Sequence, residues 1–342
     1  STSASGFPEP ARPVLCLGVT AIWTPTAEQA DATLLGRFLA AAGATDYDEL
    51  QRQSVADPAR FWRLVWETCG MVGDPGTVTL ETGPTLRETR FFPEARLNVV
   101  DTLLARNDDS DALVFRGEAG HERTLSWATL HGLVSRYQQV LRAADVGVGD
   151  RVAAMMANTP DIYAVMLATA SIGAVFTSVS PDFGTAAAAD RFGQIEPSVL
   201  FASDRYYYGG KEFSVLDKLV ELRAELPSLR QVAVVGYDGE PVAALPDGVV
   251  DAAALRNRHE PGPVTTEPLP FDHPWYVLYS SGTTGKPKCI VHRTGGVLLK
   301  HLVEHQLHSD VRPGDRIFYF TTAGWMMWNW LASGLASGAT LV

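Results

Sequence analysis

From about residue 91 onward, short apolar segments alternate with longer segments of helical periodicity, and this alternation limits the fold more than any other feature of the chain. The strand-like segments are residues 112–116, 124–126, 151–156, 174–178, 199–202, 232–235 and 275–279, and the clearest helical ones are 127–144 and 160–172. Strands separated by helices pair in parallel. The sequence therefore predicts an α/β fold of layered parallel sheets flanked by helices.

The alternation also suggests how the chain is divided. Residues 1–90 are expected to be an N-terminal extension that packs on the core, because residues 57–66 combine a Pro near a helix start with closely spaced aromatic residues. We expect residues 91–270 to form a first α/β subdomain. Residues 271–342 are then the start of a second one.

The composition argues against nucleic-acid binding, a disulfide framework and a structural zinc site. The 342 residues carry a formal net charge of -11, which disfavours a general nucleic-acid surface and requires a local positive site for any anionic ligand. Cys16, Cys69 and Cys289 are widely spaced and form no CxxC pair, so neither a disulfide framework nor a structural zinc site is expected. The N-terminal segment lacks a basic region followed by an apolar core, and we expect a cytoplasmic protein.

Two long uncharged stretches, residues 162–181 and 317–342, reach the length of a membrane span. Gly173 divides the first into a helix-like and a strand-like part, and Gly324, Gly334 and Gly338 interrupt the second. A buried helix followed by a buried parallel strand is also continuously apolar. We therefore predict no membrane span.

The most informative motif follows the apolar segment 275–279. The next nine residues combine hydroxyl side chains, glycines and cations: Ser280, Ser281, Gly282, Thr283, Thr284, Gly285, Lys286, Pro287 and Lys288. Glycine lets backbone N–H groups approach phosphate oxygens, hydroxyls donate to the same oxygens, and lysines neutralise charge as phosphate leaves. This composition predicts a loop that holds the phosphates of ATP. The less specific alternative is a surface turn without a ligand.

The motif differs from the GxxxxGK[ST] loop of the P-loop NTPases, because Ser280 stands where the first Gly would be and Pro287 follows the Lys. It resembles instead the signature of the adenylate-forming superfamily, which comprises acyl-CoA synthetases, luciferases and peptide-synthetase adenylation domains. The segment from Tyr279 to Lys288 agrees at every position, and only the next residue departs, where Cys289 replaces Gly. Residues 146–153 and 158–160 resemble further family elements in the same order.

The resemblance implies a fold and a reaction. The chain would be the large N-terminal domain of an adenylate-forming enzyme that uses ATP, Mg²⁺ and CoA. It would convert a short carboxylic acid into an acyl-adenylate and then a thioester. Lys286 and Thr284 would act at the phosphates. Its partners would then be small molecules, with no nucleic acid and no prediction of oligomeric state.

Two further segments carry the resemblance towards CoA and the acid. Tyr208, Gly209, Gly210 and Lys211 resemble the element that lines the CoA site in acetyl-CoA synthetases, with Tyr in place of the first Arg. Trp325, Met326 and Met327 stand where that family borders the acyl group, and the run resembles the acetoacetyl-CoA synthetases. The alternatives are a solvated turn for the first segment and core packing for the second.

The last residues read as a Gly turn and the opening of an apolar strand, so we expect a chain truncated at its C-terminus, without the family's C-terminal lid domain. The Mg²⁺-binding Glu, the ribose-binding Asp and the catalytic Lys of that family would lie beyond residue 342. Three alternatives stay open. They are an acetyl- or propionyl-CoA synthetase, a nucleotide-binding module without turnover, and a zinc peptidase based on the H-x-x-E-H pattern of His301 and His305.

Overall fold

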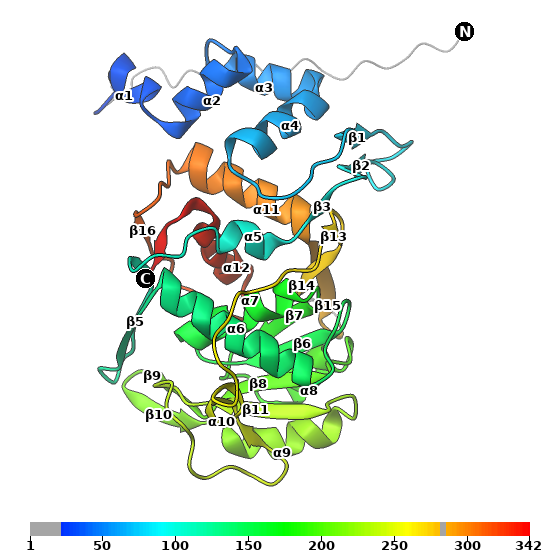
Figure 1. Ribbon diagram of the computed structural model, residues 1–342, viewed down its shortest axis with the longest axis vertical. Coiled ribbons are helices and arrows are strands. Elements are labelled where there is room, and N and C mark those ends of the chain that lie inside the picture. Colours follow the sequence, from blue (N-terminus) through cyan, green and yellow to red (C-terminus); the bar gives the residue numbers. More distant parts are fainter. Residues whose placement is uncertain (1–21, 281–284) are drawn as a thin grey trace.

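The computed structural model describes residues 22–280 and 285–342, and a seven-stranded sheet forms its centre (Figure 1). In spatial order the strands are β12 (Val250–Asp251), β11 (Gln231–Val235), β8 (Val199–Ser203), β6 (Arg151–Met155), β7 (Val175–Val179), β14 (Pro274–Ser280) and β15 (Lys288–Arg293). Every neighbouring pair is parallel except β14–β15. The predicted parallel α/β architecture is confirmed.

Helices cover both faces of this sheet, because alternate side chains of each strand point to opposite faces. On β6, Val152 and Ala154 belong to the apolar cluster that includes α6 (Trp127–Ala143) and α7 (Pro160–Ser171). Ala153 and Met155 belong instead to the cluster that includes α8 (Thr185–Phe192) and α9 (Leu216–Glu225). The short helix α10 (Ala252–Arg256) follows β12. The sheet therefore lies between two helical layers, one with α6 and α7 and the other with α8 and α9.

The first uncharged stretch belongs to this core. All residues of α7 and of β7 are buried, which explains why the sequence is continuously apolar there. Within residues 22–280 and 285–342, no helix is both long and apolar enough to cross a membrane.

A second sheet joins distant parts of the chain. Its order is β16 (Arg316–Ile317), β17 (Thr340–Leu341), β4 (Asp111–Arg116) and β5 (Glu122–Ser126). β17 is parallel to β4, whereas β4 and β5 form an antiparallel hairpin. Strands from both sides of residue 270 therefore share each of the two sheets, and the division into subdomains at that residue stays a prediction.

Beside the large sheet, α5 (Val99–Leu103), α11 (Thr294–Leu302) and α12 (Met326–Ala332) pack against the α6–α7 layer (Figure 1). α11 continues into a π-helix, η1 (Val303–His308), and α12 into a 3₁₀ helix, η2 (Ser333–Ser337). A two-stranded hairpin, β9 (Arg205–Tyr208) and β10 (Lys211–Ser214), projects after β8. A short antiparallel pair, β3 (Arg96–Leu97) and β13 (Leu269–Pro270), forms a separate two-stranded sheet.

The N-terminal region is helical and lies next to α11 (Figure 1). It consists of α1 (Ala27–Asp31), α2 (Leu34–Ala42), α3 (Tyr47–Ala56) and α4 (Pro58–Thr68). Asp57 caps α4 and Pro58 occupies its first turn, as expected for the helix predicted there. The backbone N–H of Leu34 donates to Asp310, which ties α2 to the segment after η1. At the end of the predicted N-terminal extension, β1 (Leu80–Glu81) pairs with β2 (Arg90–Phe91).

Candidate active site

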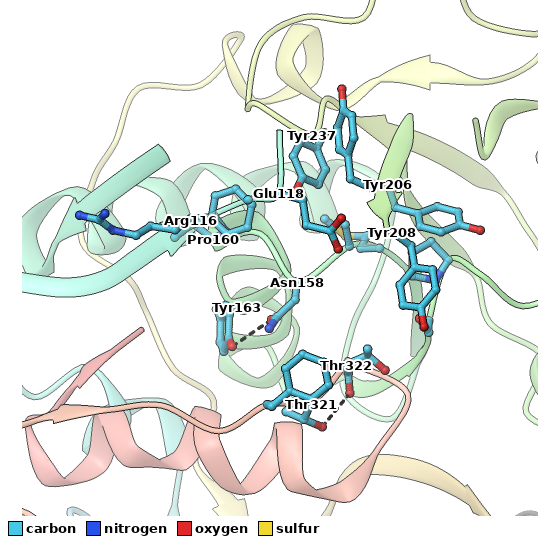
Figure 2. A pocket seen from close by; sticks show the side chains of 18 of the residues that line it. Arg116, Glu118, Asn158, Pro160, Tyr163, Tyr206, Tyr208, Tyr237, Thr321 and Thr322 are labelled. Atoms are coloured by element: carbon cyan, nitrogen blue, oxygen red, sulfur yellow. Dashed lines mark hydrogen bonds between the residues drawn. The ribbon is translucent and has the colours of Figure 1, made fainter. Parts of the chain in front are cut away.

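A cavity of about 440 Å³ opens at the carboxyl edge of the large sheet (Figure 2). The chain leaves β6 through Met156, Ala157 and Asn158, and leaves β7 through Ser180, Pro181 and Asp182, and all six residues line the cavity. Residues 113–118 of the β4–β5 hairpin, Tyr206–Tyr208, Tyr237 and residues 318–322 form the other walls. In parallel sheets the strands release their functional loops at this edge.

The predicted phosphate loop begins at the same edge. β14 is parallel to β7 and ends at Ser280, and β15 returns beside it so that Lys288 pairs with Ser280. Gly285 has a φ of 100°, a value that favours glycine, and Lys286 and Lys288 are exposed. Ser281, Gly282, Thr283 and Thr284 lie outside the described residues.

The stems of the loop are held by side-chain contacts. Gln194, just after α8, donates from Nε2 to the carbonyl of Pro287 at 2.9 Å. Thr177 on β7 lies with its Oγ1 2.9 Å from the carbonyl of Val277 and 3.0 Å from the hydroxyl of Tyr279. Burial raises the pKa of Tyr279, so its hydroxyl stays protonated at neutral pH. One stem of the loop is therefore anchored to β7 and the other to the segment that follows α8.

The residue that departs from the family signature, Cys289, lies on β15 opposite Tyr279. Its side chain is half-buried, and burial raises the pKa of its thiol. Cys69 at the end of α4 is buried, and its pKa is raised to about 11 by burial. Both described cysteines are free.

The segment that leads into α12 is pinned to the end of β7. Ser178 donates from its Oγ to the carbonyl of Ala323 at 2.5 Å. A Cβ atom on Gly324 would lie 3.2 Å from the backbone nitrogen of Ser180, so glycine permits this close approach. The two segments, far apart in sequence, thereby form one wall of the cavity.

Trp325, Met326 and Met327 begin α12 but do not line the described cavity. Trp325 is 61% exposed and Met326 46% exposed. The role of these three residues in binding the acyl group stays a prediction. The next residue, Trp328, is fully buried and belongs to the core.

Trp328 makes a contact with the cavity residue Asn158 that the sequence did not indicate. Its indole Nε1 donates to Oδ1 of Asn158 at 2.8 Å. The hydroxyl of Tyr163 donates to the same oxygen at 3.0 Å (Figure 2). The two donors orient the Asn158 amide at the floor of the cavity. Residues 158–160 resemble a family element, but no local pattern indicates this contact, because Trp328 is 170 residues away.

The predicted CoA element forms the tip of the β9–β10 hairpin. Tyr208 pairs with Lys211 across the turn Gly209–Gly210, and these glycines have φ values of 60° and 73°. Tyr208 lines the cavity and is 74% exposed, whereas Gly209, Gly210 and Lys211 lie beyond its wall on the surface. Binding of CoA to this turn stays a prediction.

Lys218 on α9 makes a second set of contacts that the sequence did not indicate. Its Nζ donates to the carbonyls of Pro181 and Phe183, at 2.8 Å and 3.1 Å, and lies 5.7 Å from the ring centroid of Tyr206. Burial lowers the pKa of Lys218. The lysine joins the loop after β7 to the β9 wall of the cavity.

The two histidines of the H-x-x-E-H pattern, His301 and His305, contact neighbouring helices and, among the described residues, do not form a zinc site. His301 approaches the Ser333 hydroxyl with Nδ1 at 2.8 Å, and His305 approaches the carbonyl of Trp330 with Nε2 at 2.9 Å. Burial lowers the pKa of His301 to about 3. In the part of the chain that the structure describes, no three His, Cys, Asp or Glu side chains gather as a metal site would require. Both rings join α11 and η1 to α12 and η2.

Comparison with known proteins agrees with this arrangement. The family model described as AMP-binding enzyme matches residues 100–342. An acetoacetyl-coenzyme A synthetase of Rhizobium meliloti (strain 1021) is 48% identical over 329 residues, which are 94% of this chain and 50% of that protein. A malonamoyl-CoA synthetase of Penicillium aethiopicum is 40% identical over 311 residues, which are 86% of this chain and 43% of that protein.

A solved structure of an acetoacetyl-CoA synthetase from Streptomyces lividans superposes with a TM-score of 0.87 at 41% identity. The match covers 94% of this chain and 50% of that one. The chain thus spans about half the length of the relatives it matches. The phosphate-loop signature, the parallel sheet that carries it and these matches together show that the chain belongs to the AMP-binding family of adenylate-forming enzymes.

Proposed function

We propose that the protein is an acid–thiol ligase that activates a short carboxylic acid, most closely acetoacetate, with ATP and transfers it to CoA. The observation that carries the proposal is where the ends of the Ser280–Lys288 loop lie. β14 ends at Ser280, at the edge where the chain leaves β6 and β7 to line the cavity. Identity of 48% to an acetoacetyl-coenzyme A synthetase supports the choice of acid.

The reaction would have two steps. The carboxylate attacks the α-phosphate of ATP, which forms an acyl-adenylate and releases pyrophosphate. The thiol of CoA then attacks the acyl carbon and releases AMP. In-line attack of this kind depends on positioning and on neutralising the leaving phosphates. Lys286 and Lys288, exposed at the loop's exit, supply that charge.

The sites of the other reactants follow from the resemblance. CoA would meet Tyr208 to Lys211, and the acid would meet Trp325 to Met327. Binding of Mg²⁺ with ATP and a cytoplasmic location remain predictions.

A pyrophosphate-exchange assay tests the first step, since it requires ATP and the acid but no CoA. With acetoacetate, the purified protein should return labelled pyrophosphate to ATP. Lys286→Ala should reduce the exchange by about 100-fold, the typical cost of removing one group that stabilises transition-state charge. The matched control is Lys300→Ala on α11, whose lysine pairs with Glu304 instead and should leave exchange unchanged. Undiminished exchange in Lys286→Ala would remove Lys286 from this role.

The malonamoyl-CoA synthetase among the relatives gives a reason to test the acid directly. Exchange should be compared with acetoacetate, acetate, propionate and malonamate at equal concentration. A preference for acetate or propionate would replace acetoacetate and leave the reaction class in place. Binding of ATP without exchange for any acid would favour a nucleotide-binding module.

A further inference from the structure

The tips of two hairpins meet above the cavity. The turn between β4 and β5 carries Glu118, whose carboxylate Oε2 accepts a hydrogen bond of 2.7 Å from the backbone N–H of Gly210, 92 residues later. In Figure 2, Glu118 projects between Tyr237 and Tyr208. The carboxylate therefore occupies a donor of the same turn that is expected to receive CoA.

The backbone conformation and the charge of this turn are both suited to binding an anion. Gly209 and Gly210 both have positive φ, and a Cβ atom on either would meet nothing within 4 Å, so these glycines serve the backbone conformation and not close packing. A turn of this kind directs a backbone N–H outward, where it can bind a negative group. Lys211 follows directly, is exposed, and forms no ion pair with the acidic side chains that the structure describes. Its charge adds to the attraction for an anion.

Aromatic contacts that do not involve Glu118 join the two hairpins, both directly and through Tyr237, which follows β11 and lies 5.0 Å from Tyr207 between ring centroids. The ring of His121 lies 5.8 Å from that of Tyr207 and 5.5 Å from that of Tyr237. Phe115 packs edge-on against Tyr237 at 5.6 Å. The exposed Glu118 side chain can therefore leave Gly210 while the hairpins stay in contact.

We propose that Glu118 is a resident anion which the terminal 3′-phosphate of CoA displaces from the Gly210 N–H. The inference rests on the proposed function, because it takes CoA as the ligand. The carboxylate and the phosphate compete for one donor and repel each other, so Glu118 weakens the binding of CoA. Glu118 thereby limits the advantage of CoA over dephospho-CoA, which lacks this phosphate, and favours release of the thioester product.

The test is calorimetric titration of the purified protein with CoA and with dephospho-CoA. Removal of one like charge near a surface site should lower the Kd for CoA by about three- to ten-fold in Glu118→Gln, which keeps the shape and an acceptor oxygen. The Kd for dephospho-CoA should change by less than about twofold. Glu118→Ala, which removes the acceptor as well, should act in the same direction.

The matched control is Glu81→Gln on β1, since Glu81 is an exposed carboxylate that pairs with Arg90, and neither residue lines the cavity. It should change neither Kd. An unchanged or weaker affinity of Glu118→Gln for CoA, or an equal gain for both ligands, would overturn the inference alone. Failure of the unsubstituted protein to bind CoA would overturn both the inference and the thioester step, while pyrophosphate exchange would still report on the first step.

Discussion

Lys218 illustrates how a single side chain shapes the cavity by bonding to backbone carbonyls. It holds Pro181 and Phe183 together from α9, so the loop after β7 depends on it. Lys218→Met should raise the KM for CoA by about tenfold, the loss expected for charged hydrogen bonds, while pyrophosphate exchange changes little. Steady-state kinetics with each substrate varied in turn measure this separation.

Lys218→Arg serves as the conservative variant and should recover part of the CoA affinity, because the guanidinium can donate to both carbonyls. An equal loss in KM for every substrate, or a loss of folding alone, would contradict a positioning role at this wall.

His301 makes stability depend on pH. Its pKa in the fold, about 3, lies below the ordinary value for histidine, so at intermediate pH the unfolded chain binds more protons than the folded one. Burial lowers the pKa of His305 in the same direction. Stability should therefore be complete near neutral pH and fall as the pH drops, by up to about 2 kcal/mol from His301 between about pH 7 and pH 5. Urea unfolding at the two pH values measures the loss.

The variant His301→Asn keeps a polar partner for Ser333 and removes the titration. It should be less stable at neutral pH but should show a smaller change between the two pH values. A slope equal to that of the unsubstituted protein would assign the pH dependence to other groups.

At the scale of elements, the start of α11 packs against the ring of Phe271. A Cβ atom on Gly295 would lie 2.1 Å from that ring, whereas one on Gly296 would come no closer than 3.9 Å. Gly295→Ala should destabilise the protein by about 1–3 kcal/mol through overpacking. The neighbouring Gly296→Ala should be neutral or slightly stabilising, because alanine favours a helix. Thermal unfolding of the pair distinguishes them, and equal effects would argue against this close packing.

Elements with a strong local signal agreed with their sequence predictions. The strands β6, β7, β8 and β11 are short apolar runs, and α6 shows helical periodicity between clear turns. The β9–β10 hairpin and the antiparallel return of β15 were not predicted, because pairing direction depends on partners elsewhere in the sheet. The π-helical turn after α11 likewise has no pattern of its own.

At the scale of the whole molecule, Asp161 joins several layers. Its side chain is 0% exposed, pairs with Arg123 on β5 at 2.6 Å and Arg256 on α10 at 2.7 Å, and accepts a bond from the hydroxyl of Tyr137 on α6. Asp161→Asn leaves two guanidinium groups without their counter-charge and should cost about 3–5 kcal/mol in the free energy of unfolding. Denaturant unfolding measures this loss.

The exposed pair of Asp272 and Arg293, 3.7 Å apart, is the matched control, and Asp272→Asn should cost less than about 1 kcal/mol. Similar effects of the two substitutions would contradict the contribution of burial to the Asp161 network.

The candidate site could be predicted only where its residues are neighbours in sequence. The phosphate loop is one continuous run of hydroxyl residues, glycines and lysines, so the sequence alone indicates its chemistry. The cavity is different, because Asn158 is oriented by Trp328 and Glu118 approaches Gly210 across 92 residues. These contacts exist only after the sheet has formed.

Because Cys289 lies at the stem of the phosphate loop while Cys69 is buried, the chain carries a natural attachment point for a fluorescent label. With Cys16 replaced by Ser, a maleimide dye would react at Cys289, beside Lys288, at mildly alkaline pH, because burial raises the pKa of this thiol. The emission of such a dye would follow nucleotide arrival in real time, without a coupled enzyme and without turnover.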